Sequence, residues 1–394
     1  MALFDKCREF SRWIASLKER REFFYLREFD PPASPIVTMR GRKLIMLGSN
    51  NYLGLATHPK VVEAAVAALR EFGTGACSSR VLTGTTSLHA RLERRLAEFK
   101  GTEDAVVFSS GFATMMGTVS AVTAEGDVVL SDSLNHASIV DGCRLSRAEV
   151  KIWRHDDMAD LEEQLASCPP EQNKLVVTDG VFSMKGTVAN LPGIRRLADT
   201  YNAAVMVDDA HGTGVLGATG RGTAEHFGME GRIDLVCGTF SKSLGTIGGF
   251  TGSTADVVTF LKLNSRAFIF TASPPPASMA TVLACLDVIE QEPELLVRMR
   301  ENTTRMKDGL KDAGFLLEET VTPIIPVLIG DDSKAFRMAG GLEDEGVVVN
   351  PIVAPAVPAG SALIRASVMA SLSKEEIDTA VSKFKLVGTR LGIV

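Results

Sequence analysis

The chain contains, at residues 204–211, the run AVMVDDAH. It is a short apolar segment that ends abruptly in two aspartates and a histidine. Continuous apolar runs of this length are typical of strands buried on both faces of a sheet. In open α/β sheets, ligands lie at the carboxyl ends of such strands. The run therefore predicts a buried parallel strand that carries Asp208, Asp209 and His211 to a ligand-binding edge.

Similar β-branched runs occur before and after this one, and amphipathic stretches separate them. Strands that alternate with helices predict right-handed crossovers and a mostly parallel sheet with helices on both faces. We therefore expect an α/β fold with a mostly parallel seven-stranded sheet in a large domain. The other six strands are expected at residues 105–108, 128–130, 150–153, 175–178, 235–237 and 248–251, with intervening helices at 92–100, 158–167 and 191–201.

The length of 394 residues predicts more than one domain, since single cores stop growing near roughly 250–300 residues. We expect an N-terminal arm at 1–57, a large domain at 58–290 and a small α/β C-terminal domain at 291–394. The arm should hold a basic amphipathic helix (10–23) and a hairpin (36–39 and 43–46). The small domain should follow the order helix 294–313, strand 324–329, helix 333–345, strands 347–349 and 363–366, and helix 374–391.

The charge, the cysteines and the first residues of the chain bear on its binding partners and its location. A net charge of −6 without a long basic run gives no electrostatic footprint for nucleic acid or for an anionic membrane surface. The six cysteines stand alone, without metal-like spacing to the histidines, so no metal site is expected. The first residues carry charges and no signal-peptide pattern, and no apolar run is long enough to span a membrane. We expect a cytoplasmic protein.

Lys242 lies in GTFSKSLG, residues 238–245, directly after an expected buried strand. A poorly solvated amine there favours its neutral, nucleophilic form, which suits an imine with an aldehyde cofactor. The alternative is a surface lysine in a glycine and serine turn. Asp208, with Asp209 as the fallback, could keep a pyridine nitrogen protonated, so that the ring withdraws electrons. The alternative for this acidic pair is a cap on the following turn.

An anion site is expected where a strand is followed by Ser109, Ser110, Gly111 and Phe112 and then by a helix-compatible run. Unpaired backbone amides and the helix dipole favour a phosphate at such a helix N-terminus. Further hydroxyl donors could come from Thr239, Ser241, Thr271 and Ser273.

Two more side chains fit such a site. His136, in NHAS at 135–138, could lie flat on a cofactor ring, although a lone histidine is more often structural. Arg365, on an apolar strand, is a bidentate donor suited to a substrate carboxylate. A structural ion pair is the alternative for this arginine.

These residues together resemble the α-oxoamine synthases, which are fold-type-I pyridoxal 5'-phosphate (PLP) enzymes. The family condenses an amino acid with an acyl-CoA and releases CoA and carbon dioxide. The resemblance runs in order from about residue 40 to 390. It is carried by residues 50–55, 73–75, 79–85, 135–138, 179–184, 208–214 and 238–242.

Within the family, the chain is most similar to the bacterial serine palmitoyltransferase branch, through residues 239–245, 248–250, 270–273, 349–351 and 355–358. This branch implies L-serine, a long-chain acyl-CoA and a product of the 3-ketodihydrosphingosine type in sphingolipid biosynthesis. The 8-amino-7-oxononanoate synthase and 2-amino-3-ketobutyrate CoA ligase branches remain alternatives. Ser79 stands where the aminolevulinate synthase branch has threonine, which argues against a glycine-only pocket. Lys185 stands where relatives often carry an acidic residue, which leaves amino-acid choice open.

The resemblance also implies roles for individual residues. His136 would stack on the PLP ring, Asp208 would pair with its nitrogen, His211 and Ser183 would lie near its phenolic oxygen, and Lys242 would form the imine and move the substrate's α-proton. Gly111, Phe112 and Thr239 would hold the phosphate, and Ser110 and Ser241 are also expected to bind the cofactor. Thr271 and Ser273 would reach the phosphate from a neighbouring subunit. That arrangement implies a homodimer with shared active sites. Asn50, Ser79 and Arg365 would bind substrate, and the acyl chain could bring the protein near a membrane.

Other interpretations of these residues remain open. An aminotransferase or a decarboxylase could use the same fold, because a fold does not fix a reaction. A catalytically silent partner subunit of a larger synthase is a further alternative, although Lys242 argues against it. The amino acid, the acyl length and the choice between CoA and an acyl-carrier protein depend on pocket shape, which the sequence does not show.

Overall fold

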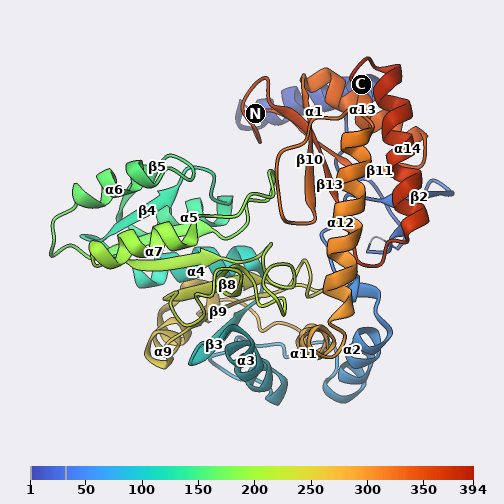
Figure 1. Ribbon diagram of the computed structural model, residues 1–394. Helices are drawn as coiled ribbons and strands as arrows, with labels where there is room; N and C mark the ends of the chain where they lie inside the picture. The colour runs from blue at the N-terminus through green and yellow to red at the C-terminus, as the bar shows by residue number, and fades with distance from the viewer. Residues whose placement is uncertain (1, 32) are drawn as a thin grey trace. The chain divides into compact units, whose positions relative to one another are not determined.

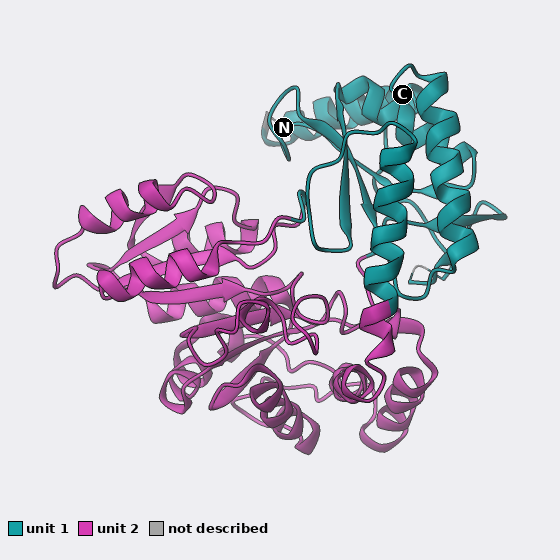
Figure 2. Cartoon of the chain, viewed as in Figure 1, with its two compact units in different colours: residues 1–49, 184–186, 298–394 teal, residues 50–183, 187–297 magenta. Residues whose placement is uncertain are grey.

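The computed structural model describes residues 2–31 and 33–394. It divides into two compact units (Figure 2). Unit 2 comprises Asn50–Ser183 and Thr187–Val297, and unit 1 comprises Met1–Ser49, Met184–Gly186 and Arg298–Val394. Residues 1 and 32 of the expected arm lie outside the described part. We keep the three-part division at residues 57 and 290 as a proposal about how the chain folds.

Unit 2 is built on a seven-stranded sheet (Figure 1). Every pairing in it is parallel except those of β9, which runs antiparallel to both of its neighbours. The expected seven-stranded, mostly parallel sheet is thereby confirmed. Its order is β3 (Asp104–Phe108), β9 (Gly249–Ser253), β8 (Leu235–Thr239), β7 (Ala204–Asp208), β6 (Lys174–Asp179), β4 (Val128–Asp132) and β5 (Glu149–Trp153).

Both faces of the central strands β4, β6, β7 and β8 are covered, which explains their continuous apolar runs, whereas the edge strand β5 leaves Val150 and Ile152 exposed. In β7, Val205 and Val207 pack into one hydrophobic cluster and Met206 into another, because successive side chains of a strand point to opposite faces. The first cluster includes residues of α6 (Met158–Ala166) and α7 (Leu191–Thr200). The second includes residues of α4 (Gly111–Val122) and α5 (Ala137–Ser146). Unit 2 also contains α2 (Pro59–Phe72), α3 (Ser87–Lys100), α8 (Thr223–His226), α9 (Ala255–Asn264), α10 (Arg266–Ile269) and α11 (Pro276–Gln291).

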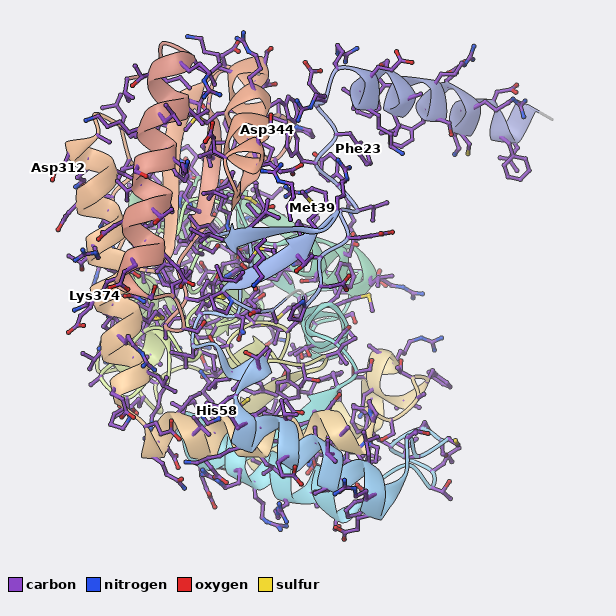
Figure 3. All side chains as sticks on the ribbon, turned by 90° about the vertical axis from the view of Figure 1, so that its right-hand side faces the viewer. Phe23, Met39, His58, Asp312, Asp344 and Lys374 are labelled. Carbon is purple, nitrogen blue, oxygen red and sulfur yellow. The ribbon has the colours of Figure 1, made fainter. Side chains whose placement is uncertain are left out.

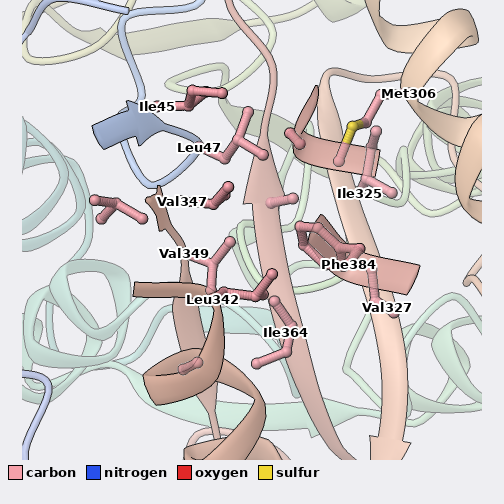
Figure 4. Close-up of a cluster of buried hydrophobic side chains, with 14 of the residues drawn as sticks. Ile45, Leu47, Met306, Ile325, Val327, Leu342, Val347, Val349, Ile364 and Phe384 are labelled. Carbon is pink, nitrogen blue, oxygen red and sulfur yellow. The ribbon is translucent and has the colours of Figure 1, made fainter. Parts of the chain in front are cut away.

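Unit 1 joins the two ends of the chain in one core. Strand β2 (Arg42–Met46) pairs antiparallel with β1 (Ile36–Met39) and parallel with β11 (Val347–Val348). Figure 4 shows side chains from both chain ends in one hydrophobic cluster, among them Ile45, Val347 and Phe384. The remaining elements are β10 (Ile324–Gly330), β12 (Asn350–Ile352), β13 (Ala362–Ser367), α13 (Asp332–Asp344), α14 (Lys374–Arg390) and most of α12 (Glu294–Asp312).

The N-terminal helix differs from the expected bounds. Helix α1 spans Asp5–Glu19 rather than 10–23, and most of its side chains are exposed (Figure 3). It ends early because Arg21 has a φ of 60°, a left-handed conformation that a helix cannot continue through. Within the described residues, no helix has the length and apolarity needed to cross a membrane.

Candidate active site

A cavity of about 350 Å³ lies in unit 2 at the carboxyl ends of the parallel strands. It brings together most of the residues expected to bind a cofactor, although they come from widely separated parts of the sequence. These are Ser110, Gly111, Phe112, His136, Ser183, Asp208, His211, Thr239, Ser241 and Lys242. The sheet therefore places all of them around one space.

Asp208 is the last residue of β7 and lines the cavity with only 6% of its surface exposed. Its Oδ1 accepts a hydrogen bond from the backbone N–H of Ala210 at 3.0 Å. Burial raises the pKa of its carboxyl to about 6, and the nearby Lys242 ammonium opposes that rise. A buried carboxylate with such a pKa is suited to binding a cationic partner.

Asp209, the fallback choice, does not line the cavity. Its Oδ2 lies 2.7 Å from Nζ of Lys100, and both side chains are almost fully buried. Successive residues at a strand end point in opposite directions. The structure thus directs Asp208 to the cavity and Asp209 into an ion pair.

Lys242 follows β8 and lines the same cavity. Asp208, Asp179 and His136 line the same cavity, and the positive charge of Lys242 opposes the rise in the pKa of the two carboxyls and lowers the pKa of the imidazole. An amine beside buried carboxyls is suited to holding and moving a proton.

His136 caps the N-terminus of α5. Its Nδ1 accepts a hydrogen bond from the backbone N–H of Ser138 at 3.3 Å and lies 2.7 Å from the Ser138 hydroxyl. Burial, and then the charge of Lys242, lower the pKa of the imidazole below its usual value. A neutral, fixed ring is suited to stacking on an aromatic ligand.

The N-terminus of α4 forms the anion-binding end of the cavity. Oγ of its N-cap, Ser110, accepts a hydrogen bond from the N–H of Ala113 at 3.1 Å. A Cβ at Gly111 would lie 2.6 Å from Oγ1 of Thr239, so only glycine lets the helix approach β8 this closely. The Thr239 hydroxyl lies 2.9 Å from that of Ser241. Amides and hydroxyls gathered at a helix N-terminus are suited to a phosphate group.

The residues that line this cavity fit PLP. Within one cavity, Lys242 can bond its aldehyde, Asp208 can face its ring nitrogen, and the start of α4 can hold its phosphate.

The remaining expected residues do not line this cavity. Ser273 donates a hydrogen bond from its hydroxyl to the carbonyl of Gly84 at 2.7 Å, and its hydroxyl lies 3.0 Å from Nε2 of His89. Ser79 forms a β-bridge with Ala272, next to Thr271. The segment with Thr271 and Ser273 is thus fixed to the segment with Ser79.

Two expected substrate-binding residues also lie outside the lining. Oδ1 of Asn50 accepts a hydrogen bond from the hydroxyl of Tyr52 at 3.2 Å. Arg365 lies on β13 in unit 1, where it is 5% exposed and donates to the Ser367 hydroxyl at 2.9 Å.

Sequence reasoning gave no role to two residues that the structure places here. Asp179 ends β6, lines the cavity and is paired in register with Asp208. Burial, and then the charge of Asp208, raise its pKa well above the usual value. It could have been found, because it is a strand-end carboxyl like Asp208. The hydroxyl of Tyr52 lies 2.7 Å from Nδ1 of His211, and no pattern in the sequence links these two residues.

Comparisons with known proteins show which family the chain resembles. Residues 42–384 match the family model of aminotransferase class I and II. The chain is 44% identical over 381 residues to 8-amino-7-oxononanoate synthase 1 of Bacillus velezensis, and the match covers 97% of each chain. It is also 44% identical over 370 residues to the serine palmitoyltransferase of Sphingobacterium spiritivorum, which covers 94% of this chain and 93% of the relative. A solved structure of SPT with a PLP internal aldimine has a TM-score of 0.94 at 36% identity, over 100% of this chain and 99% of that one.

Proposed function

Because the chain belongs to the aminotransferase class I and II family, and within it to the PLP-dependent α-oxoamine synthases, we propose that it condenses L-serine with a long-chain acyl-CoA. The products would be an α-aminoketone of the 3-ketodihydrosphingosine type, CoA and carbon dioxide. The observation that carries the catalytic part is the common cavity of Lys242, Asp208 and the N-terminus of α4.

Each side chain around the cavity would have a separate role in the reaction. Bound PLP supplies an electron-withdrawing ring that stabilises negative charge at the substrate's α-carbon. Asp208 would hold a proton on the ring nitrogen, and His136 would pack on the ring face. The amine of Lys242 would take the α-proton from the amino acid and return it later. His211 and Ser183 would orient the phenolic oxygen.

The remaining ligands are proposed by residue type and place. Ser110, Gly111, Phe112, Thr239 and Ser241 would hold the phosphate. Asn50, Ser79 and Arg365 would bind the substrate, with the guanidinium of Arg365 on the α-carboxylate.

The amino acid and the acyl group are the open part of the proposal. Relatives named 8-amino-7-oxononanoate synthase are 42–46% identical over 97% of this chain, and relatives named serine palmitoyltransferase are 44–45% identical over 91–94% of it. The second candidate is therefore condensation by an 8-amino-7-oxononanoate synthase. A 2-amino-3-ketobutyrate CoA ligase activity is a third, and an acyl-carrier protein could replace CoA as the thioester.

We also propose a homodimer with shared sites, in the cytoplasm and close to a membrane when the acyl substrate requires it. The support for shared sites is the location of Thr271 and Ser273 away from the cavity of their own chain, where Ser273 binds Gly84 and His89.

The test is a grid of purified PLP-loaded enzyme with serine, alanine and glycine against acetyl, pimeloyl and palmitoyl thioesters. Thiol release gives the rate, and mass spectrometry identifies the aminoketone. The proposal expects serine with palmitoyl-CoA to give the highest kcat/KM. If alanine with the pimeloyl thioester is the best pair, the result favours the second candidate, 8-amino-7-oxononanoate synthase. If glycine with acetyl-CoA is the best pair, the result favours the third, 2-amino-3-ketobutyrate CoA ligase. Amino transfer to a keto acid without thiol release would contradict all three.

A further inference from the structure

Lys100 and Asp209 form a deeply buried ion pair one residue beyond Asp208. Lys100 ends α3, and Asp209 follows the last residue of β7. Nζ lies 2.7 Å from Oδ2, and each side chain is only 2% exposed. Burying two charges costs several kcal/mol per ion unless each is paired and fully hydrogen-bonded. A pair this deep therefore depends on good surrounding contacts.

The side-chain hydrogen bonds of the pair all go to one segment, the loop of residues 209–223. The three protons of the Lys100 ammonium are donated to Oδ2 of Asp209, to Oγ1 of Thr213 at 2.8 Å and to the carbonyl of Arg221 at 2.6 Å. Oδ1 of Asp209 accepts from the N–H and the hydroxyl of Thr223 at 3.0 and 2.6 Å. The pair thus ties the beginning of the loop to its end.

The loop packs tightly around this carboxylate. A Cβ at either Gly212 or Gly222 would collide with the Asp209 side chain, and Gly222 also has a φ of +108°. Only glycine avoids this collision, because it has no Cβ, and only glycine adopts such a positive φ without strain. The position of Asp209 is therefore fixed from several sides.

Cavity residues lie on both sides of the fixed aspartate. Asp208 precedes it, and its carboxylate accepts the N–H of Ala210. His211 follows it, is 6% exposed, and has its Nδ1 at 2.7 Å from the Tyr52 hydroxyl. A shift of Asp209 would therefore move two cavity side chains at once.

We propose that the Lys100–Asp209 ion pair is a positioning element that fixes the His211 imidazole and the Asp208 carboxylate against the bound cofactor. Neither Lys100 nor Asp209 lines the cavity, so both act through the loop. The inference rests on the proposed places of His211 and Asp208 beside PLP.

The test uses the full-length holoenzyme and follows the absorbance of bound PLP against pH. Asp209→Asn is nearly isosteric and leaves Lys100 without its carboxylate partner. His211→Asn reports what loss of the imidazole itself does. The matched control is Arg195→Met, because Arg195 is also a buried cation, 2.7 Å from Asp234, that does not line the cavity.

We expect the midpoint of the absorbance change to shift by roughly one pH unit in Asp209→Asn and in the same direction in His211→Asn. In Asp209→Asn, kcat should fall about 10- to 100-fold with little change in KM for the acyl thioester, since misplaced groups mainly slow the chemical step. The midpoint in Arg195→Met should equal that of the parent even if its melting temperature falls.

An Asp209→Asn enzyme with the parent's midpoint would overturn the inference, and so would an equal shift in Arg195→Met. An unchanged midpoint in His211→Asn would also overturn it and would place the failure in the proposed role of His211. If Asp209→Asn does not fold, Thr213→Val removes one hydroxyl from both members of the pair. An unchanged absorbance midpoint in Thr213→Val would likewise overturn the inference, and the expected shift is smaller than in Asp209→Asn.

Discussion

Asp208 and Asp209 are neighbours in the sequence but have different environments. Asp208 faces a cavity that also holds Lys242, and burial raises its pKa to about 6. Asp209 forms a buried ion pair with Lys100. From the sequence, the residue types that the chemistry requires were predicted, but the choice between these two carboxyls was only a preference. The deciding partner, Lys100, lies 109 positions earlier, and no local pattern links the two residues.

The role of Lys242 can be tested by removing its amine. Lys242→Ala should lose the visible absorbance of the lysine-bound cofactor, and thioester turnover should fall by at least about 10³-fold, because both covalent attachment and proton transfer are lost. Absorbance and thiol release check this. The control is Lys385→Ala, an exposed lysine of α14, which should retain both properties. Normal thiol release by Lys242→Ala would show that another group does the chemistry.

The raised pKa of Asp208 predicts how the stability of cofactor-free protein depends on pH. Its folded-state pKa of about 6 lies above the unfolded value of about 3.9. The folded state therefore holds the extra proton and loses stability as pH rises through this window. At pH 7 to 8, Asp208→Asn should raise the melting temperature by a few degrees, since a shift of about two pKa units is worth about 3 kcal/mol and about 1 kcal/mol corresponds to roughly 1 °C in a chain of this length.

Thermal melts of the protein without PLP, from pH 4 to 8, measure this effect. The gain from Asp208→Asn should disappear toward pH 4. The control is Asp312→Asn, which removes an exposed carboxylate at the last residue of α12 and should leave the melting temperature close to that of the parent. A gain that grows as pH falls would contradict the sign of the shift.

At the scale of elements, most strands of the large sheet were predicted well because they are short, buried, largely apolar runs. The errors lie where an element depends on contacts elsewhere. The edge strand β12 holds only Asn350–Ile352, includes a proline and pairs with β13 alone, so its sequence carries little strand signal. Helix α1 ends at Glu19, two residues before the left-handed Arg21, and no glycine marks the end.

The close contact between α4 and β8 predicts the effect of a single methyl group. Gly111→Ala would place Cβ 2.6 Å from Oγ1 of Thr239. The start of α4 should be displaced, and the Kd for PLP should rise about tenfold or more, because the phosphate donors move. Equilibrium dialysis measures this change. The control is Gly340→Ala inside α13, where the nearest atom, of Phe24, lies at 3.6 Å and PLP affinity should not change. Equal affinity in both variants would contradict a phosphate site at α4.

At the scale of the whole molecule, the sequence predicted an arm, a large domain and a small domain. This three-part division remains a proposal about how the chain folds. In the structure, residues up to Ser49 belong to the same compact unit as the C-terminal part. The reason is the pairing of β2 with β11, in which Ile45 is opposite Val347. Contacts between segments some 300 residues apart leave no signature in local hydrophobic patterns.

The shared site can be tested in heterodimers. If the partner subunit's Thr271 reaches the phosphate, a dimer of Lys242→Ala with Thr271→Val keeps one complete site. Its activity should be about half that of the parent dimer. A dimer of Lys242→Ala with the unaltered chain is the control and should show the same value. Two differently tagged chains, co-expressed and purified in two steps, supply both species. Activity well below the control would show that Thr271 serves its own chain.

The role of Lys242 as the anchor of the cofactor can be tested by locating the covalent attachment of PLP. The holoenzyme is reduced with borohydride, digested and analysed by mass spectrometry. We expect the pyridoxyl group on the peptide that contains Lys242 and on no other lysine. A pyridoxyl group on Lys100 or another lysine, or an unmodified Lys242 in fully loaded enzyme, would contradict the account.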